Sequence, residues 1–228
     1  MTTQRRPVLA ANWKMHHGPT AASAFLESFL LKHAPRSDRS VIVFPSALAL
    51  AAARHAAAAR PDIESGVQNI HGAEKGAFTG ETSAAIAADA GARYVLVGHS
   101  ERRHVFGESD AETAEKCSRA AAHGLVPMLC VGEKIEEREA GETEAVVLRQ
   151  LRAGLAALGS ADLVRAMIAY EPVWGIGTGR TATPQDATSA HQAIRAELRA
   201  IGGSGTDVIP ILYGGSVNVG NAAALLAA

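Results

Sequence analysis

The chain is organised around Ala169–Arg180, which reads Ala-Tyr-Glu-Pro-Val-Trp-Gly-Ile-Gly-Thr-Gly-Arg. The apolar residues 167–170 predict a short buried strand, and Pro172 ends it because proline cannot donate to a sheet ladder. One carboxylate, Glu171, stands at the strand end. The following segment carries Trp174 and three glycines. This pattern is typical of a catalytic base beneath a lid, and equally of a surface loop that follows a strand.

The same strand-then-helix unit recurs outward from this stretch in both directions. Further strands are expected at residues 8–13, 41–44, 63–67, 94–97, 126–131 and 208–213. Helices are expected after a Thr20 or Ser23 cap, at 47–60, 83–90, 110–123, 143–158 and 184–201, and from Asn218 onward. Alternating apolar strands and helices predict a parallel sheet covered by helices. No linker or shift in composition divides the chain, so we expect one domain over residues 1–228.

Polar residues distinguish between the two parallel architectures, a doubly wound sheet and a (β/α)₈ barrel. An open sheet gathers its ligand at one switch point, whereas a barrel gathers functional residues from all round the ring. Polar side chains follow the ends of strands along the whole chain, and they are Asn12, Lys14, His99, Glu133, Glu171 and Ser216. This spread favours the barrel.

Composition limits the possible functions. The 228 residues are 47% hydrophobic, which allows a substantial core, and the net charge of −1 argues against a nucleic-acid binder. A small anionic substrate is still allowed, because it needs only a local positive site. No apolar run reaches the roughly 18 residues of a membrane span. The two cysteines form no disulfide framework, which favours a reducing compartment, and the cytoplasm is the expected location.

Five sequence motifs, in order along almost the whole chain, resemble the triosephosphate isomerases. The motifs are Asn12–Met15, Gly76–Glu81, Gly98–Arg103, Tyr170–Trp174 with Gly177–Gly179, and Tyr213–Val217. The resemblance implies a TIM barrel and the interconversion of dihydroxyacetone phosphate and D-glyceraldehyde 3-phosphate through an enediol(ate). It also implies that the reaction uses neither a cofactor nor a metal.

The resemblance also implies a role for each catalytic residue. Glu171 would be the base that moves the proton between two carbons. His99 would be neutral and would polarise the substrate oxygen, since the N-terminus of the following helix disfavours an imidazolium. Lys14 would supply a fixed positive charge, and Asn12 would donate to the substrate oxygen and hold Lys14. Whether Glu101 is catalytic or structural stays open.

The phosphate group of the substrate would be bound by backbone amides. The resemblance implies amides at Gly177 and Ser216, with the dipole of a helix that begins at Asn218. A lid would close over the site to exclude water. The expected lid residues are Pro172, Val173, Trp174, Gly175, Ile176, Gly177, Thr178 and Gly179.

The glycine-punctuated loop 68–82 resembles the loop that inserts into a neighbouring subunit in this family. Thr79 would then reach the partner subunit's Asn12, so the implied assembly is a homodimer. A mobile surface loop is disfavoured, because an exposed tip has little reason to carry Phe78.

The C-terminus departs from the family pattern. Members of the family continue with an eighth strand, a glycine-rich phosphate loop and a final helix, so we expect a TIM barrel that lacks strand 8 and that helix. Two alternatives stand beside triosephosphate isomerase. One is an isomerase of a longer phosphorylated ketose on the same machinery, which only the size of the pocket would distinguish. The other, which the missing strand 8 favours, is an inactive truncated barrel that binds a phosphate ligand or acts as an assembly partner.

Three other kinds of site are rejected. The run Gly175–Arg180 fails the dinucleotide pattern because Arg180 stands where the third glycine belongs. No His-Glu-x-x-His pair supports a metal site. Cys130 is interpreted as a packing residue and not as a nucleophile.

Overall fold

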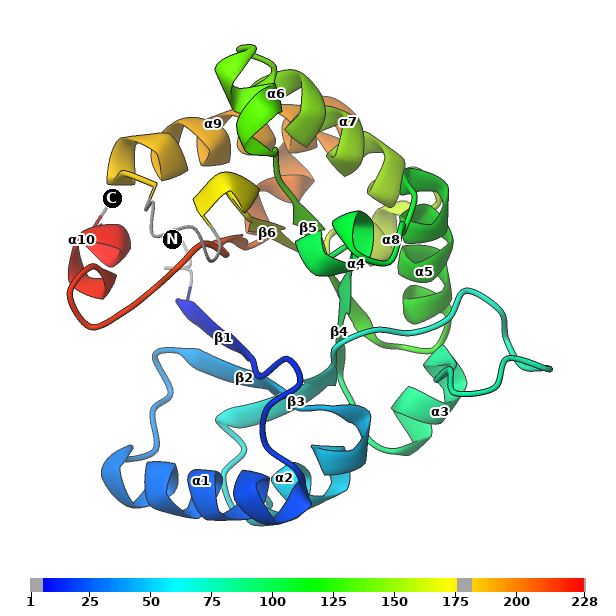
Figure 1. Cartoon of the computed structure of the whole chain (residues 1–228), viewed down its shortest axis with the longest axis vertical. Helices are drawn as coiled ribbons and strands as arrows, with labels where there is room; N and C mark the ends of the chain where they lie inside the picture. The colour runs from blue at the N-terminus through cyan, green and yellow to red at the C-terminus, as the bar shows by residue number, and fades with distance from the viewer. Residues whose placement is uncertain (1–5, 176–181, 228) are drawn as a thin grey trace. The chain divides into compact units, whose positions relative to one another are not determined.

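The computed structural model describes residues 6–175 and 182–227 (Figure 1). The chain divides into two compact units. Unit 1 comprises Met1–Leu96 with Arg119–Pro127, and unit 2 comprises Val97–Ser118 with Met128–Ala228. The single domain expected over residues 1–228 stays a prediction.

The sheet of unit 1 is parallel and follows the order of the chain. Its strands are β1 (Val8–Asn12), β2 (Ser40–Phe44), β3 (Ile63–Val67) and β4 (Tyr94–Val97). The first residue of β5, Val126, lies beside β4, since its N–H donates to the carbonyl oxygen of Arg93 at 2.8 Å. All four strands lie within a residue or so of the predicted bounds, because each is an apolar run with a clear stop.

The helices of unit 1 cover these strands. They are α1 (Pro19–Lys32), the 3₁₀ helix η1 (Ala47–Ala49), α2 (Leu50–Ala56) and α3 (Ala84–Asp89). Helices α1 and α2 lie side by side (Figure 1). They pack on the sheet through a buried cluster of small and large apolar residues, namely Trp13, Ala22, Leu26, Val43, Ala49 and Ala53.

Two helix boundaries in unit 1 were predicted wrongly. The cap of α1 is Gly18, which makes no side-chain bond, and Pro19 stands at the first helical position, so neither Thr20 nor Ser23 is the cap. Helix α2 ends at Ala56 and not at residue 60. The chain turns instead at residues 57–60, where the N–H of Arg60 donates to the carbonyl oxygen of Ala57 at 2.8 Å.

Unit 2 contains a second set of parallel strands. They are β5 (Val126–Val131, from Met128 onward), β6 (Met167–Tyr170) and β7 (Ile211–Tyr213). The register pairs β5 with β6 and β6 with β7, so that Tyr170 lies beside Tyr213. This arrangement brings the segments that follow the three strands to the same end of the sheet.

The predicted strand at 208–213 begins too early. Residues Gly203–Val208 form a 3₁₀ helix, η3, and β7 starts at Ile211. The guanidinium of Arg195 donates to the carbonyl oxygens of Thr206 and Ile209 at 2.8 and 2.6 Å. These carbonyls therefore bond to a side chain and not to a neighbouring strand.

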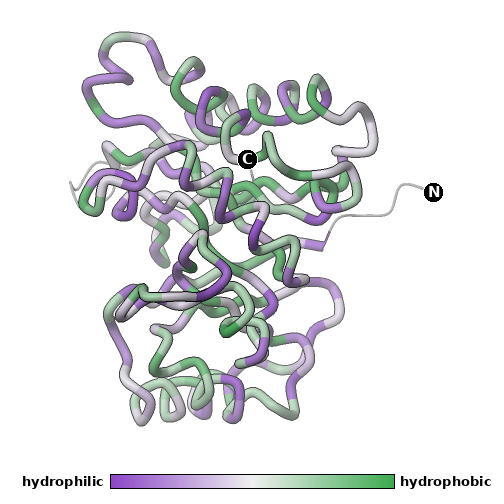
Figure 2. Tube along the Cα trace, turned by 90° about the vertical axis from the view of Figure 1, so that its right-hand side faces the viewer, coloured by the Kyte–Doolittle hydropathy of each residue, from purple (hydrophilic) through white to green (hydrophobic). Residues whose placement is uncertain are grey.

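Helices surround the strands of unit 2. They are α4 (Ser100–His104), α5 (Asp110–Ala122, which extends into unit 1), α6 (Ile135–Glu139), α7 (Thr143–Leu155), α8 (Ser160–Leu163), α9 (Pro184–Gly202) and α10 (Ala222–Ala227), with the 3₁₀ helix η2 at Val173–Gly175. Hydrophilic and hydrophobic residues alternate along the helical turns (Figure 2), so that each long helix buries one face.

The final helix does not begin at Asn218, as predicted, but at Ala222. The side-chain oxygen of Asn218 accepts from the N–H groups of Gly220 and Asn221, which makes a turn in place of a helical start. The short helices α4, α6 and α8 were not predicted as separate elements, because four or five residues are too few to show a periodic pattern.

Candidate active site

Glu171 lies directly after β6, as the sequence predicts. Its carboxylate is buried, with 5% of the residue exposed. One oxygen, Oε2, accepts from the backbone N–H of Ser100 at 2.8 Å, and Oε1 lies 3.1 Å from Nε2 of His99. The structure therefore brings two of the predicted catalytic residues, Glu171 and His99, into contact.

His99 caps the N-terminus of α4. Its Nδ1 accepts from the backbone N–H of Glu101 at 3.2 Å, so this nitrogen carries a lone pair and no proton. The ring proton then belongs on Nε2, where it faces Glu171.

Cys130 lies near the same carboxylate but is not poised as a nucleophile. Burial, and then the negative charge of Glu171, raise the pKa of its thiol well above the ordinary value. A thiol in such surroundings stays protonated and packs as a small apolar group. The packing role expected for Cys130 fits this environment.

Glu133 is a second buried carboxylate, with 0% of the residue exposed. It accepts from the hydroxyl of Tyr170 at 3.1 and 3.2 Å and from the indole Nε1 of Trp174 at 2.8 Å. Nη1 of Arg138 lies 3.6 Å away, and its guanidinium carbon lies 4.3 Å from the centroid of the Trp174 ring. Burial, followed by the charge of Glu133, raises the pKa of Tyr170, so its hydroxyl keeps its proton and donates.

The sequence placed Glu133 at a strand end but gave it no role. In the structure it anchors the segment that follows Glu171, since it binds side chains on both sides of that residue. Of the expected lid, residues Pro172, Val173, Trp174 and Gly175 are described, and Ile176, Gly177, Thr178 and Gly179 lie outside the described residues. The phosphate contact expected at Gly177 therefore stays a prediction.

Ser216 follows β7 and the glycine pair 214–215. Its hydroxyl donates to the carbonyl oxygen of Gly175 at 3.2 Å, and the N–H of Gly214 donates to the carbonyl oxygen of Tyr170 at 2.7 Å. Unit 2 thus gathers Glu171, His99 and Ser216 around the ends of β6 and β7. Because the helix starts at Ala222, no helix dipole begins at Asn218.

Asn12 and Lys14 belong to unit 1 and follow β1. The side-chain oxygen of Asn12 accepts from the backbone N–H of Lys14 at 2.9 Å. Lys14 has a φ of 49°, in the left-handed region that a lysine rarely adopts. Nε2 of Gln68 donates to the carbonyl oxygens of Lys14 and Phe44 at 2.8 and 2.9 Å, which fixes this conformation from the other side.

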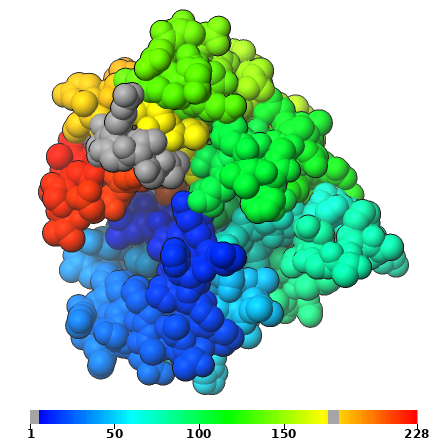
Figure 3. Space-filling view, viewed as in Figure 1, coloured from blue at the N-terminus to red at the C-terminus, as the bar shows by residue number. Residues whose placement is uncertain are grey.

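Gln68 was missed by sequence reasoning because its partner Lys14 is 54 residues away. It begins the loop 68–82, which protrudes from unit 1 (Figure 3). In this loop the ring of Phe78 lies 4.1 Å from that of His71, centroid to centroid, and Phe78 is 45% exposed. Thr79, next to Phe78, is exposed as well.

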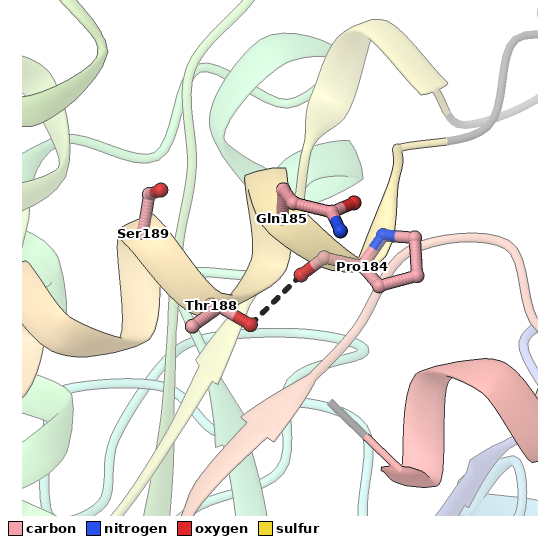
Figure 4. Close-up of a pocket in the computed structure, with 4 residues that line it drawn as sticks. All are labelled: Pro184, Gln185, Thr188 and Ser189. Carbon is pink, nitrogen blue, oxygen red and sulfur yellow. Dashed lines mark hydrogen bonds between the residues drawn. The ribbon is translucent and has the colours of Figure 1, made fainter.

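A separate shallow pocket of about 360 Å³ lies at the start of α9 (Figure 4). Its walls are Pro184, Gln185, Thr188 and Ser189, and the hydroxyl of Thr188 donates to the carbonyl oxygen of Pro184 at 2.9 Å. None of the predicted catalytic residues lines it.

The described part of the chain contains no group of three or more His, Cys, Asp or Glu that could hold a metal ion. None of its helices is both long enough and apolar enough to cross a membrane.

A family model described as triosephosphate isomerase matches residues 7–228. The chain belongs to the triosephosphate isomerase family. The triosephosphate isomerase of Symbiobacterium thermophilum is 46% identical over 224 residues, which cover 98% of this chain and 87% of that protein. The triosephosphate isomerase of Thiobacillus denitrificans is 47% identical, with 98% and 88% covered, and that of Herpetosiphon aurantiacus is 45% identical, with 98% and 89% covered.

Membership of the triosephosphate isomerase family confirms three predictions. The family is the predicted one, the fold is the α/β barrel fold of that family, and the activity is triosephosphate isomerase. The described residues agree with this fold, because their strands are parallel and alternate with helices. The match also favours the triose phosphate over a longer phosphorylated ketose.

Proposed function

We propose that Glu171 is the base that carries the proton in the triosephosphate isomerase reaction. The carboxylate takes a proton from the carbon next to the substrate carbonyl, the C–H electron pair moves into the carbon skeleton, and the carbonyl oxygen becomes an enediolate oxygen. The enediolate oxygen then gains a proton, the hydroxyl on the neighbouring carbon loses its proton and becomes the new carbonyl, and the same carboxylate returns its proton to the former carbonyl carbon. Its burial at the end of β6, beside a histidine, supports this role.

Both oxygens of Glu171 already accept hydrogen bonds, from His99 and from the N–H of Ser100. We propose that the carboxylate exchanges these donors for the substrate when it turns toward a substrate carbon. This exchange keeps the base buried and partnered between turnovers, since an unpaired buried carboxylate is costly. We propose that the rotation of Glu171 accompanies substrate binding.

His99 is proposed to act as a neutral electrophile through Nε2–H. Its Nδ1 is occupied by the N–H of Glu101, so the proton on Nε2 can be offered to the substrate oxygen once Glu171 moves away. A neutral imidazole is a better match than an imidazolium for an enediolate oxygen that must be protonated and deprotonated in turn. This enzyme family is a standard example of such tuning.

Lys14 and Asn12 are proposed to bind the substrate, and Ser216 and Gly177 to bind its phosphate. Lys14 supplies the positive charge that the phosphate and the developing oxyanion need. Its backbone conformation supports this role. Lys14 is held at a positive φ by hydrogen bonds with the side chains of Asn12 and Gln68, and such strained residues cluster at functional sites. The proposed chemistry involves only these side chains and backbone amides, with no cofactor.

The contact between Glu171 and His99 carries the proposal, and removing the carboxylate tests it. Isomerisation of D-glyceraldehyde 3-phosphate is measured with a coupled assay for the wild-type chain, Glu171→Asp and Glu171→Gln. The amide cannot accept a proton, so Glu171→Gln is expected to lose on the order of 10²–10⁴-fold in kcat. Glu171→Asp is expected to retain part of the activity. Undiminished activity of a folded Glu171→Gln variant would exclude this base.

We also propose that the chain forms a homodimer through the loop 68–82, with Thr79 reaching the partner subunit's Asn12. Two exposed apolar side chains of unit 1 support this surface: Phe78 is 45% and Met15 97% exposed. Light scattering should give twice the chain mass of 23.6 kDa. The variant Phe78→Glu should shift the mass to that of the monomer, whereas Leu31→Glu, at an exposed apolar residue of α1, should not.

A cytoplasmic location is proposed as well. Both cysteines, Cys117 and Cys130, are free and buried, which suits a chain that keeps its thiols reduced. Fractionation of cells that express the chain tests this, with recovery outside the cytoplasm as the contrary result.

A further inference from the structure

The side chain of Gln150, on α7, binds the backbone of Gly132 through both ends of its amide. Its Oε1 accepts from the N–H of Gly132 at 2.8 Å, and its Nε2 donates to the carbonyl oxygen of Gly132 at 3.1 Å. Gln150 is buried, with 3% exposed. Gly132 follows directly after β5, so the amide takes the place that a neighbouring strand residue would occupy.

The residues on either side of Gly132 support the backbone of the base. The N–H of Glu171 donates to the carbonyl oxygen of Val131 at 2.8 Å, and the N–H of Val173 donates to the carbonyl oxygen of Glu133 at 3.1 Å. Between these two bonds the chains are in close contact, because a β-carbon on Gly132 would lie 1.7 Å from the carbonyl oxygen of Glu171. Any shift of Gly132 is therefore passed directly to Glu171.

The same turn also places the carboxylate of Glu133. That carboxylate binds Tyr170 on one side of Glu171 and Trp174 on the other. The turn 131–133 thus fixes the segment 170–174 twice, by backbone bonds and by the Glu133 side chain. The side chain of Gln150 makes hydrogen bonds to both the N–H and the C=O of Gly132, the central residue of this turn.

We propose that Gln150 is a positioning residue for the isomerase reaction: it holds the turn 131–133, and through it the backbone of Glu171. The proposal rests on the proposed role of Glu171 as the base. Only a group that both donates and accepts can satisfy the N–H and the C=O of one residue, and the amide of glutamine does so from a helix. Small displacements matter here, because a misplacement of about 1 Å can cost on the order of 100-fold in rate.

Three variants separate positioning from general stability. Gln150→Met keeps the length of the side chain and removes both hydrogen bonds. Gln150→Glu keeps the shape, and its carboxyl reproduces both bonds only when it is protonated. Leu151→Ala is the matched control, since it removes a fully buried side chain from the next position of α7 and leaves the amide in place. The kcat/KM of each folded variant is measured from mildly acidic to mildly alkaline pH.

The introduced carboxyl would be buried and would face the carbonyl oxygen of Gly132. Burial raises the pKa of this carboxyl, and the negative charges of Glu133 and Glu171 on the adjoining segments raise it further. The positive charge of Arg103 lowers the pKa. Arg103 lies nearby, since it donates to the carbonyl oxygen of Cys130 at 3.4 Å. The activity of Gln150→Glu relative to wild type should therefore be highest at acidic pH and should fall as the pH rises. Gln150→Met should be low throughout, by about tenfold to a hundredfold.

Activity of Gln150→Met equal to that of Leu151→Ala, or a Gln150→Glu ratio that does not change with pH, overturns the proposal. If Gln150→Met fails to fold, the pH profile of Gln150→Glu still decides. In a Glu171→Gln background, Gln150→Met should cause little further loss, because Gln150 acts through Glu171. If Gln150→Met lowers kcat/KM in the Glu171→Gln background by the same factor as in wild type, the proposal is overturned. An active Glu171→Gln single variant is a separate result, which refutes the role of Glu171 as the base.

Discussion

At the scale of single residues, Gly132 shows how little space surrounds the base. A β-carbon there would lie 1.7 Å from a backbone oxygen of Glu171, which no rotation of a side chain can relieve. We expect Gly132→Ala to lower the free energy of unfolding by about 1–3 kcal/mol and to reduce kcat as Glu171 is displaced. Urea denaturation and the coupled assay measure the two effects.

The control for this variant is Gly205→Ala, where an added β-carbon meets no atom within 4 Å. Its stability should stay within about 0.5 kcal/mol of wild type, as is usual at open sites. Equal stability of the two alanine variants would contradict the close contact between Gly132 and the backbone of Glu171.

Lys14 illustrates backbone strain at a proposed catalytic position. Its φ of 49° is accessible to glycine without strain but costs other residues about 1–2 kcal/mol. Lys14→Gly is therefore expected to be more stable than Lys14→Ala by about 1 kcal/mol, although both lose the ammonium group and hence activity. Urea denaturation of the two variants, side by side, provides the measurement. An alanine variant of equal or greater stability would show that the position is unstrained.

At the scale of elements, the connection between α2 and β3 is closed by ion pairs. The guanidinium of Arg60 donates to both carboxylate oxygens of Asp62 at 2.8 Å and to the carbonyl oxygen of His33 at 2.8 Å. The N–H of Arg36 reaches the same carboxylate at 3.3 Å. One carboxylate thus joins the end of α1 to the entry of β3.

This pairing predicts a defined pH dependence. The hydrogen bonds from Arg60 lower the pKa of Asp62 to about 2 from its ordinary value of 3.8. A depressed pKa in the folded state stabilises the fold above the unfolded pKa, and this contribution is lost as the pH falls from about 4 through about 2. Asp62→Asn should be less stable than wild type at neutral pH, and the difference should vanish at the acidic end. A difference that persists there would contradict the pairing.

The sequence predicted the strands better than the helix boundaries. Apolar runs such as 94–97 and 126–131 have local stops, so their bounds follow from the chain itself. The start of β7 depends on Arg195, and the start of α10 depends on the side chain of Asn218. These hydrogen bonds depend on tertiary structure or on one side-chain rotamer, and a periodic pattern does not reveal them.

The sequence motifs predicted the central residues of the candidate site but not the residues that support them. Glu171 and His99 were named from the sequence, and the structure places them in contact. The supporting residues Gln68 and Gln150 were not found, because a glutamine in a loop or on a helix resembles a surface residue. Their partners lie 54 and 18 residues away, so that only the folded chain connects them.

At the scale of the whole molecule, the two cysteines report on unfolding. Burial raises the pKa of Cys117 to about 12, and it raises the pKa of Cys130 as well. Only the thiolate reacts, so neither thiol should be labelled by an alkylating reagent in the native protein at mildly alkaline pH. Labelling should rise together with the loss of helical circular dichroism as urea is added. Rapid labelling without denaturant would contradict the burial of these residues.

The hydrogen bond between Trp174 and Glu133 has a spectroscopic consequence. A carboxylate oxygen 2.8 Å from the indole nitrogen draws electron density away from the attached proton, which moves that proton's magnetic resonance downfield. The chain contains only two tryptophans, so selective isotope labelling gives a spectrum of two indole peaks. One of these peaks senses the segment that carries Glu171. The fold therefore contains its own reporter, through which substrate arrival could be followed in solution without attaching a dye.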